Sequence, residues 1–183
     1  MNKKICVFGS YKSLSKKEKE NIILLGRLLA EGGFTLVNGG FGGTMEDTAK
    51  GAKSAGGKTI GVTYYKYGDT KKSRNPYIDE EIRTENIFER LRVMLEISDG
   101  FVVLPGGTGT LLELAAVLEH INKNMMRPKP LVALGPYWKG ALEALSEEAI
   151  LSEPARKASG AISCRDLVTF VDTPEEAVAK LTV

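Results

Sequence analysis

Short apolar runs alternate with amphipathic stretches along most of the chain. The apolar runs do not alternate with polar residues, which is typical of strands buried on both faces of a parallel sheet. The amphipathic stretches carry apolar residues at helical spacing, and the glycine pairs Gly32-Gly33 and Gly56-Gly57 follow two of them. The pattern predicts an α/β fold: a Rossmann-like, doubly wound parallel sheet of about seven strands flanked by helices.

The predicted elements follow one another with mostly short connections. Strands are expected over residues 5–8, 34–37, 59–62, 81–83, 100–104, 130–134 and 167–171. Helices are expected over residues 15–31, 44–55, 86–97, 110–123, 139–150 and 174–181. Because 183 residues suit one domain, we expect residues 1–183 to form a single domain.

Two stretches interrupt this rhythm, at residues 64–79 and 152–165. The first is polar and rich in tyrosine and basic residues, and it is too long for a simple turn. Two interpretations stay open for it, a solvated surface loop and a lid that faces a substrate.

Four glycine-containing segments follow predicted strands, at residues 9–11, 39–44, 105–110 and 135–136. Open parallel sheets bind ligands beyond the carboxyl ends of their strands, where the strand order reverses. Glycine lets the backbone approach a ligand closely, and the helix that follows begins with unpaired N–H groups and a partial positive charge. These features predict phosphate binding that needs no lysine.

The third of these segments carries a complete motif. Residues 105–113 read Pro-Gly-Gly-Thr-Gly-Thr-Leu-Leu-Glu, which is PGGxGTxxE between a strand and a helix. The common nucleotide motifs do not match: the first strand is followed by Gly9-Ser10-Tyr11-Lys12 instead of GxGxxG, and no GxxxxGK[ST] loop occurs. NAD-dependent dehydrogenases and P-loop NTPases are therefore disfavoured.

PGGxGTxxE resembles the signature of the Lonely Guy-type cytokinin riboside 5′-monophosphate phosphoribohydrolases, formerly labelled possible lysine decarboxylases. Matching features run from about residue 5 to 135 and include Val37-x-Gly39-Gly40, Gly43-x-Met45 and Ile60-Gly61-Val62. The resemblance implies hydrolysis of the N-glycosidic bond of a nucleoside 5′-monophosphate to free base and ribose 5-phosphate. It also implies a homodimer, with contacts through the helices near residues 86–97 and 110–123.

The resemblance further implies that Glu113 and Arg90 are catalytic. Together with the glycine loops, it indicates substrate or phosphate binding by Gly106, Gly107, Thr108, Gly109, Thr110, Gly9, Ser10, Gly40, Gly42 and Gly43. A glutamate beside the ribose could activate water and stabilise an oxocarbenium-like sugar, and a guanidinium could hold ribose or phosphate oxygens. Thr110-x-x-Glu113 also fits a capping box, so a purely structural role for Glu113 stays open.

The stretch around Arg90 departs from the signature of the family. It reads Phe88-Glu89-Arg90-Leu91-Arg92-Val93-Met94, without the histidine and lysine of H-x-R-K-x-x-M. In this respect the chain resembles a related branch, the molybdenum-cofactor carriers, which bind their ligand without hydrolysing it. A non-catalytic nucleotide or molybdenum-cofactor (pterin) carrier is therefore the alternative function.

The composition excludes several other classes. The chain has a single histidine, His120, so a Ser-His-Asp hydrolase would have only one candidate base. It has only two cysteines, so a zinc site would need nearly every histidine and cysteine in the chain, and we expect no metal. A pyridoxal-phosphate decarboxylase needs a Schiff-base lysine, and no lysine lies in the glycine loops, so we expect no cofactor. A net charge of +2 gives no case for nucleic acid or an anionic membrane.

The sequence also predicts a cellular location and the roles of four further residues. Neither a signal peptide nor an apolar run of membrane-spanning length is visible, which favours a cytoplasmic protein. We expect surface or structural roles for His120, Arg92 and Lys12, with phosphate contact an open alternative for Lys12, and core packing for Trp138.

Overall fold

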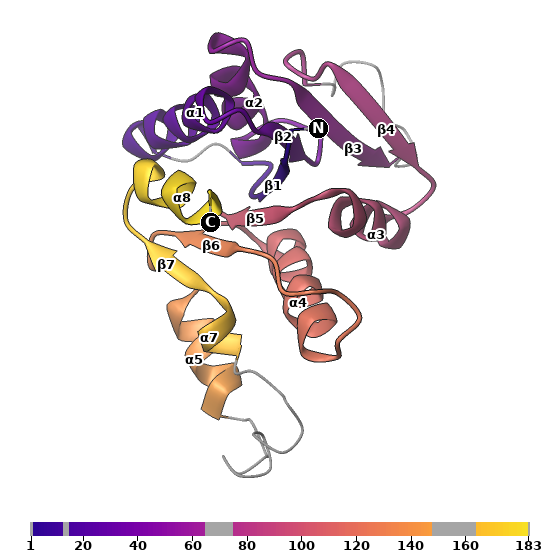
Figure 1. The fold of residues 1–183 in the computed structure, drawn as a ribbon, viewed down its shortest axis with the longest axis vertical. Coiled ribbons are helices and arrows are strands. Elements are labelled where there is room, and N and C mark those ends of the chain that lie inside the picture. The colour runs from indigo at the N-terminus through magenta and orange to yellow at the C-terminus, as the bar shows by residue number, and fades with distance from the viewer. Residues whose placement is uncertain (1, 13–14, 65–74, 148–163, 183) are drawn as a thin grey trace.

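The computed structural model describes residues 2–12, 15–64, 75–147 and 164–182. In these residues seven parallel strands form one sheet in the order β4-β3-β2-β1-β5-β6-β7, as Figure 1 shows. The strands are β1 (Lys4–Phe8), β2 (Thr35–Asn38), β3 (Thr59–Tyr64), β4 (Glu80–Thr84), β5 (Gly100–Val103), β6 (Leu131–Leu134) and β7 (Thr169–Val171). The helices are α1 (Lys16–Glu31), α2 (Thr44–Ser54), α3 (Ile87–Ile97), α4 (Thr108–Asn122), α5 (Lys139–Glu147), α7 (Cys164–Leu167) and α8 (Pro174–Leu181). The predicted doubly wound α/β fold is confirmed.

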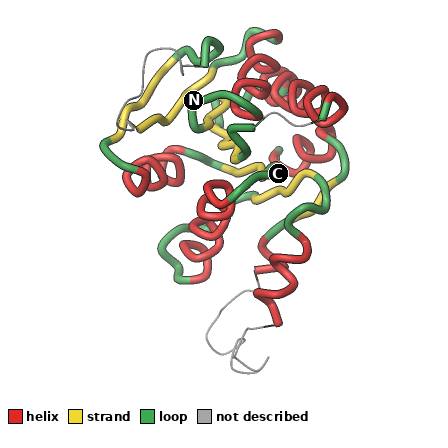
Figure 2. Tube along the Cα trace, turned by 180° about the vertical axis from the view of Figure 1, so that it is seen from behind, coloured by secondary structure: helices red, strands yellow, loops and turns green. Residues whose placement is uncertain are grey.

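Helices cover both faces of the sheet (Figure 2). Along β1, Ile5 and Val7 point into a core formed with α1, α2 and α8, whereas Cys6 and Phe8 point into a second core formed with α3, α4 and α5. Side chains alternate between the two faces of a strand, so a strand covered on both sides needs apolar residues at every position. This explains the unbroken apolar runs in the sequence.

The strand order reverses at β1. Cys6 pairs with Val37 of β2 on one side and with Phe101 of β5 on the other. The chain builds outward from β1 through β2, β3 and β4, and then returns to place β5 against the free side of β1. The loops after β1, β2 and β5 therefore start at the carboxyl ends of three adjacent strands, at the point where doubly wound sheets bind ligands.

Three predicted boundaries are wrong by two residues. Strand β3 ends at Tyr64, two residues after the predicted end. Helix α4 begins at Thr108, two residues before the predicted start, and the predicted strand 167–171 begins only at Thr169 because Cys164–Leu167 form α7. Leu167 still packs against the core beside the buried Val168. An apolar run this short does not distinguish the last turn of a helix from the start of a strand.

The described residues cover only part of the two irregular stretches. Tyr64 is the last residue of β3, and residues 75–79 lead into β4, whereas 65–74 lie outside the described residues. The same holds for 152–163 and for the last three residues of the predicted helix 139–150. Within the described part of the chain, no helix combines the length and hydropathy needed to cross a membrane.

Candidate functional site

The loops that follow β1 and β2 are joined at Ser10. The backbone N–H and the hydroxyl of Thr44 both donate to the carbonyl oxygen of Ser10, at 2.9 and 3.1 Å. Gly43 stands in the left-handed region, with φ of +66°, and a Cβ there would lie 2.4 Å from the same oxygen. Only glycine fits this conformation at so close an approach, so Gly43 allows Gly9, Ser10 and the second loop to pack together.

The turn after β2 is held by Asn38. Its side-chain oxygen accepts a hydrogen bond from the Gly40 N–H at 2.8 Å, and its amide nitrogen donates to the Met45 carbonyl at 2.9 Å. Asn38 is fully buried, so these bonds satisfy polar groups that water cannot reach. The asparagine thus fixes the glycine turn that includes Gly39, Gly40 and Gly42.

The loop after β5 leads directly into α4. The N-cap is Gly107, whose lack of a side chain leaves the first N–H groups of the helix without a side-chain partner. Gly107, Thr108 and Gly109 are exposed, while Thr110 is buried with its hydroxyl against the backbone of Gly106. The first turn of α4 therefore presents free N–H groups at the carboxyl edge of the sheet.

The capping-box interpretation of Glu113 is wrong. With α4 starting at Thr108, Thr110 is inside the first turn and Glu113 is the sixth helical residue, too far along to cap the start. Its carboxylate instead accepts a hydrogen bond from Arg90: the Nη1–Oε1 distance is 3.1 Å, and both side chains are 10% exposed. A glutamate and an arginine separated by 22 residues thus form a buried ion pair between α4 and α3.

Backbone and aromatic groups surround the Arg90 guanidinium. Its Nε donates to the Val62 carbonyl of β3 at 2.7 Å, and its guanidinium carbon lies 5.9 Å from the ring centres of both Phe41 and Tyr64. A Cβ at Gly39 would lie 1.8 Å from Nη2, so the guanidinium rests against the bare backbone of the β2 loop. This position leaves the guanidinium little freedom to move.

Burial raises the pKa of Glu113 to about 7, although the charge and the hydrogen bond of Arg90 oppose this increase. The thiol of Cys6, fully buried on β1, has a pKa raised well above its usual value, mainly by burial and further by the charge of Glu113. A carboxyl group that titrates near neutrality can accept and return a proton under ordinary conditions. The ion pair is therefore equipped for acid–base chemistry.

The raised pKa predicts a pH-dependent cost in stability. Because the folded state binds the Glu113 proton more tightly than the unfolded state, stability should fall as pH rises from 4.5 to about 7. Relative to Glu113→Gln, the loss should total about 3 kcal/mol and level off above pH 7. Urea denaturation of both proteins at several pH values measures it, with Glu119→Gln, on the exposed side of α4, as control. A constant difference between pH 4.5 and 8 would contradict the buried titration.

The structure brings most of the predicted site residues to one edge. Gly9, Ser10, Gly40, Gly42 and Gly43 lie in the loops after β1 and β2, and Gly106, Gly107, Thr108, Gly109 and Thr110 lie at the start of α4. Glu113 follows Gly109 by four residues and Thr110 by three, which places it one turn further along the same side of the helix.

Four other residues were assigned surface or structural roles. Arg92 is exposed and pairs with Glu96. Lys12 is exposed in the loop after β1, where its backbone N–H donates to the Ser10 hydroxyl at 3.0 Å. His120 contacts the Ala116 carbonyl within α4 at 2.7 Å. Trp138 is buried and donates to the Leu104 carbonyl at 3.0 Å, so it has the packing role that was expected.

Sequence reasoning did not single out Phe41 or the Val62 carbonyl, and it included Tyr64 only as the first residue of the 64–79 stretch, for which a lid facing a substrate stayed open. Phe41 does leave a signal, because it is a large aromatic side chain within a run of four glycines and has no apolar neighbour in sequence. The carbonyl of Val62, which lies within β3, leaves none, since every residue of a strand has the same backbone group.

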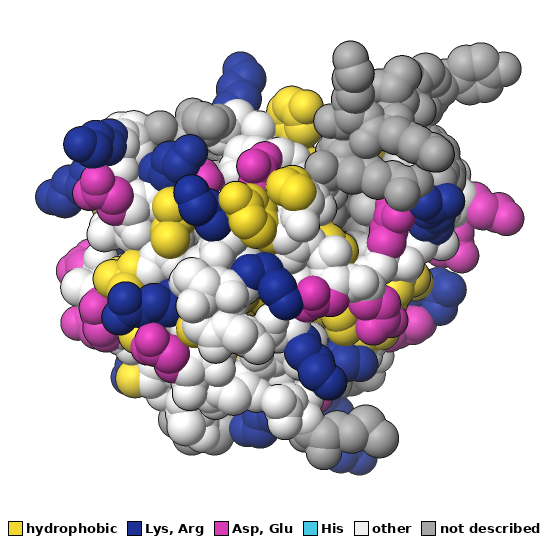
Figure 3. Space-filling model, turned by 90° about the horizontal axis from the view of Figure 1, so that it is seen from above, with side chains coloured by type: hydrophobic (Ala, Val, Ile, Leu, Met, Phe, Trp, Pro, Cys, Tyr) yellow, Lys and Arg dark blue, Asp and Glu magenta, His cyan; other side chains and the backbone are white. Residues whose placement is uncertain are grey.

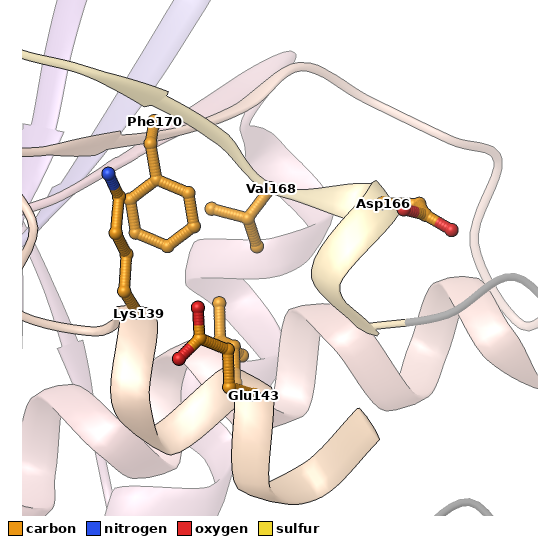
Figure 4. Close-up of a pocket in the computed structure, with 6 residues that line it drawn as sticks. Lys139, Glu143, Asp166, Val168 and Phe170 are labelled. Atoms are coloured by element: carbon orange, nitrogen blue, oxygen red, sulfur yellow. The ribbon is translucent and has the colours of Figure 1, made fainter. Parts of the chain in front are cut away.

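A separate hollow of about 350 Å³ lies between α5, α7 and β7, away from the ion pair. Lys139, Glu143, Asp166, Val168 and Phe170 line it, together with Leu142 (Figure 4). The Lys139 ammonium lies 5.4 Å from the centre of the Phe170 ring. None of the predicted site residues reaches this hollow, and the Asp166 carboxylate points away from the other side chains.

No cluster of three or more histidine, cysteine, aspartate or glutamate side chains suited to a metal occurs among the described residues. On the face that Figure 3 shows, basic and acidic side chains are intermixed instead of forming a patch of one sign. The described part of the carboxyl edge thus combines the Arg90–Glu113 pair with the N–H groups at the start of α4.

The model of the SLOG cluster4 family matches residues 2–151. The chain belongs to this family. The cytokinin riboside 5′-monophosphate phosphoribohydrolase of Mycobacterium marinum is 32% identical over 155 residues, which cover 84% of this chain and 80% of that protein. The enzyme of that name from Mycobacterium tuberculosis is 40% identical over 96 residues, which cover 49% of this chain and 48% of that protein. This chain is thus also a member of the phosphoribohydrolase family whose signature its PGGxGTxxE motif resembles.

Solved structures share the fold of this chain. The molybdenum cofactor binding protein of Rippkaea orientalis matches with a TM-score of 0.72 and 25% identity, over all of this chain and 96% of that one. The molybdenum cofactor carrier protein of Chlamydomonas reinhardtii has a TM-score of 0.73 at 24% identity, covering all of this chain and 97% of that one, and shows the shared fold.

Proposed function

We propose that this chain is a nucleoside 5′-monophosphate phosphoribohydrolase, which releases the free base and ribose 5-phosphate. The observation that carries the proposal is the buried Arg90–Glu113 pair, held at the carboxyl edge one helical turn from a glycine-rich helix start. The names of the two mycobacterial relatives support the same reaction.

The start of α4 is the proposed phosphate site. The N–H groups of Gly107 to Thr110 have no side-chain cap, and the positive end of the helix favours an anion there. Gly9, Ser10, Gly40, Gly42 and Gly43 would line the adjoining sugar and phosphate path. A phosphate at the helix start would bring the ribose next to Glu113, which lies on the second turn of α4.

The proposed chemistry needs one water molecule. As the bond between C1′ and the base nitrogen breaks, positive charge develops on the sugar, and the Glu113 carboxylate stabilises it. A water oxygen bonds to C1′ while its proton passes to Glu113, and that proton then goes to the departing base. Arg90 would hold ribose or phosphate oxygens and keep the carboxylate in place.

Gly109 provides a test of the phosphate site. A glycine in a helix costs about 0.5–1 kcal/mol against alanine, and a Cβ at Gly109 would meet nothing within 4 Å. Gly109→Ala should therefore raise the free energy of unfolding by about that amount, yet weaken AMP binding about tenfold or more because the methyl group occupies ligand space. Calorimetric titration and urea denaturation measure the two effects.

Gly140 is the matched control for Gly109. It is also the second residue of an exposed helix start, on α5, and a Cβ there likewise meets nothing within 4 Å. Gly140→Ala should raise stability without changing AMP affinity. Unchanged AMP affinity in Gly109→Ala would contradict phosphate binding at the start of α4.

The second candidate is a carrier that binds a nucleotide or the pterin of a molybdenum cofactor without hydrolysis. The similarity to the Rippkaea orientalis protein favours it. Incubation with AMP and related monophosphates, followed by chromatography for free base, separates the two. Base release supports the hydrolase, whereas tight binding without release supports the carrier.

We also propose that the protein is a homodimer. Phe88 on α3 is 73% exposed, and Leu111 and Leu112 on α4 are 40% and 37% exposed. Exposed apolar side chains on two adjacent elements are typical of interaction surfaces. Analytical ultracentrifugation tests this proposal, with a dimer expected at micromolar concentration and a monomer overturning it.

A further inference from the structure

Phe41 and Tyr64 form an aromatic pair at the carboxyl edge of the sheet. Phe41 belongs to the loop after β2 and Tyr64 ends β3, and their ring centres lie 6.1 Å apart at an interplanar angle of 81°. Both side chains are partly exposed, and neither belongs to the two apolar cores of the domain. Two large rings are thus placed beside the ion pair without being needed to fill a core.

Support of Arg90 alone does not account for the two rings. The guanidinium is already fixed by the Glu113 carboxylate at 3.1 Å and the Val62 carbonyl at 2.7 Å. The ring centres, at 5.9 Å, are near the outer limit of about 6 Å for a cation–π interaction. Two charge-assisted hydrogen bonds therefore fix the position of the guanidinium, and the rings add little to them.

The position of the pair along the sheet points to a ligand. Strands β5, β1, β2 and β3 are consecutive neighbours, and adjacent strands lie about 4.8 Å apart. From the helix start after β5 to the rings at β2 and β3 is thus a span of about 10–15 Å, with Glu113 and Arg90 between the two ends. A nucleoside monophosphate has the same order of parts: phosphate, ribose and planar base.

We propose that Phe41 and Tyr64 bind the planar base of the ligand by stacking, and that they distinguish nucleotides from sugar phosphates without a base. The proposal rests on the proposed function for the placement of phosphate and ribose. Stacking on an aromatic side chain accepts any base with a π-face. The pair therefore selects for the presence of a flat nitrogen heterocycle more than for its hydrogen-bonding edge.

The test compares AMP with ribose 5-phosphate by calorimetric titration of the full chain. Phe41→Leu and Tyr64→Leu should each weaken AMP binding about tenfold, while ribose 5-phosphate affinity changes less than twofold. Tyr64→Phe keeps the ring and should keep AMP affinity. Tyr137→Leu, which removes an exposed aromatic side chain outside the pair, is the control and should change neither affinity.

Each outcome decides the proposal. Equal weakening of both ligands in the leucine variants would show that the rings serve only to hold Arg90, and it would overturn stacking. Wild-type protein that binds ribose 5-phosphate as tightly as AMP would overturn it too, even if base release is observed. Selective loss of AMP binding supports stacking even if no base is released, so the failure of the hydrolase proposal stays distinguishable.

Discussion

Replacing Glu113 by glutamine is expected to lower kcat for base release by about 10³-fold while leaving AMP affinity within about threefold. Glutamine keeps the shape and can still accept the hydrogen bond from Arg90, so the ion-pair geometry should survive. It can neither take a proton from water nor stabilise positive charge on the sugar. Single-turnover release of adenine, measured alongside calorimetric AMP binding, separates the two effects.

The pH profile gives the same prediction a second readout. If the ionised carboxylate acts, kcat/KM of the wild type should rise with pH and level off above the Glu113 pKa of about 7. Glu119→Gln, an exposed substitution on the same helix, should keep both rate and profile. A Glu113→Gln variant with normal turnover would refute the mechanism.

Local patterns in the sequence were sufficient to predict the fold. The strands are short apolar runs such as Ile5 to Phe8, and covered parallel strands produce such runs irrespective of their neighbours. Boundaries were less secure, because the start of α4 depends on a glycine N-cap that makes no side-chain bond. Gly107 leaves no capping signal, whereas Thr110 and Glu113 imitate one.

The site could be predicted only in part for a related reason. The glycine loops were found because strand ends and glycines are visible in sequence, and the sheet order then brings the loops together. The contact between Arg90 and Glu113 required α3 and α4 to pack side by side, which no local pattern encodes. The Val62 carbonyl and the ring of Tyr64 reach Arg90 only because β3 and α3 also meet.

The packing around Arg90 also limits which residue can take its place. Its Nε and Nη1 donate in two directions, to a backbone carbonyl and to a carboxylate, and Nη2 rests against Gly39. Lysine has a single ammonium on a flexible stem and cannot reproduce this fork. An arginine is therefore required for geometric reasons, irrespective of its charge.

Arg90→Met is expected to lower kcat/KM by about 10²–10³-fold and to destabilise the fold. Methionine fills the volume of the arginine stem but leaves the Val62 carbonyl without its donor, at a cost of about 1–3 kcal/mol. Because Arg90 lowers the Glu113 pKa in the wild type, its removal should raise that pKa above 7. Glu113 would then be mostly protonated at neutral pH, and the active carboxylate form would be scarce.

The sign of this linkage makes the prediction specific. Protonation of Glu113 stabilises the folded state, and this contribution falls as pH rises until the folded-state pKa is passed. A higher folded-state pKa in Arg90→Met extends the fall to higher pH. Relative to wild type, Arg90→Met should therefore lose more stability at pH 8 than at pH 6. Arg92→Met, two residues along α3, removes only an exposed pair with Glu96 and should stay within about 0.5 kcal/mol of wild type at both pH values. Urea denaturation of the three proteins at pH 6 and 8 measures the difference, and a pH-independent loss in Arg90→Met would show that the arginine does not control the protonation of Glu113.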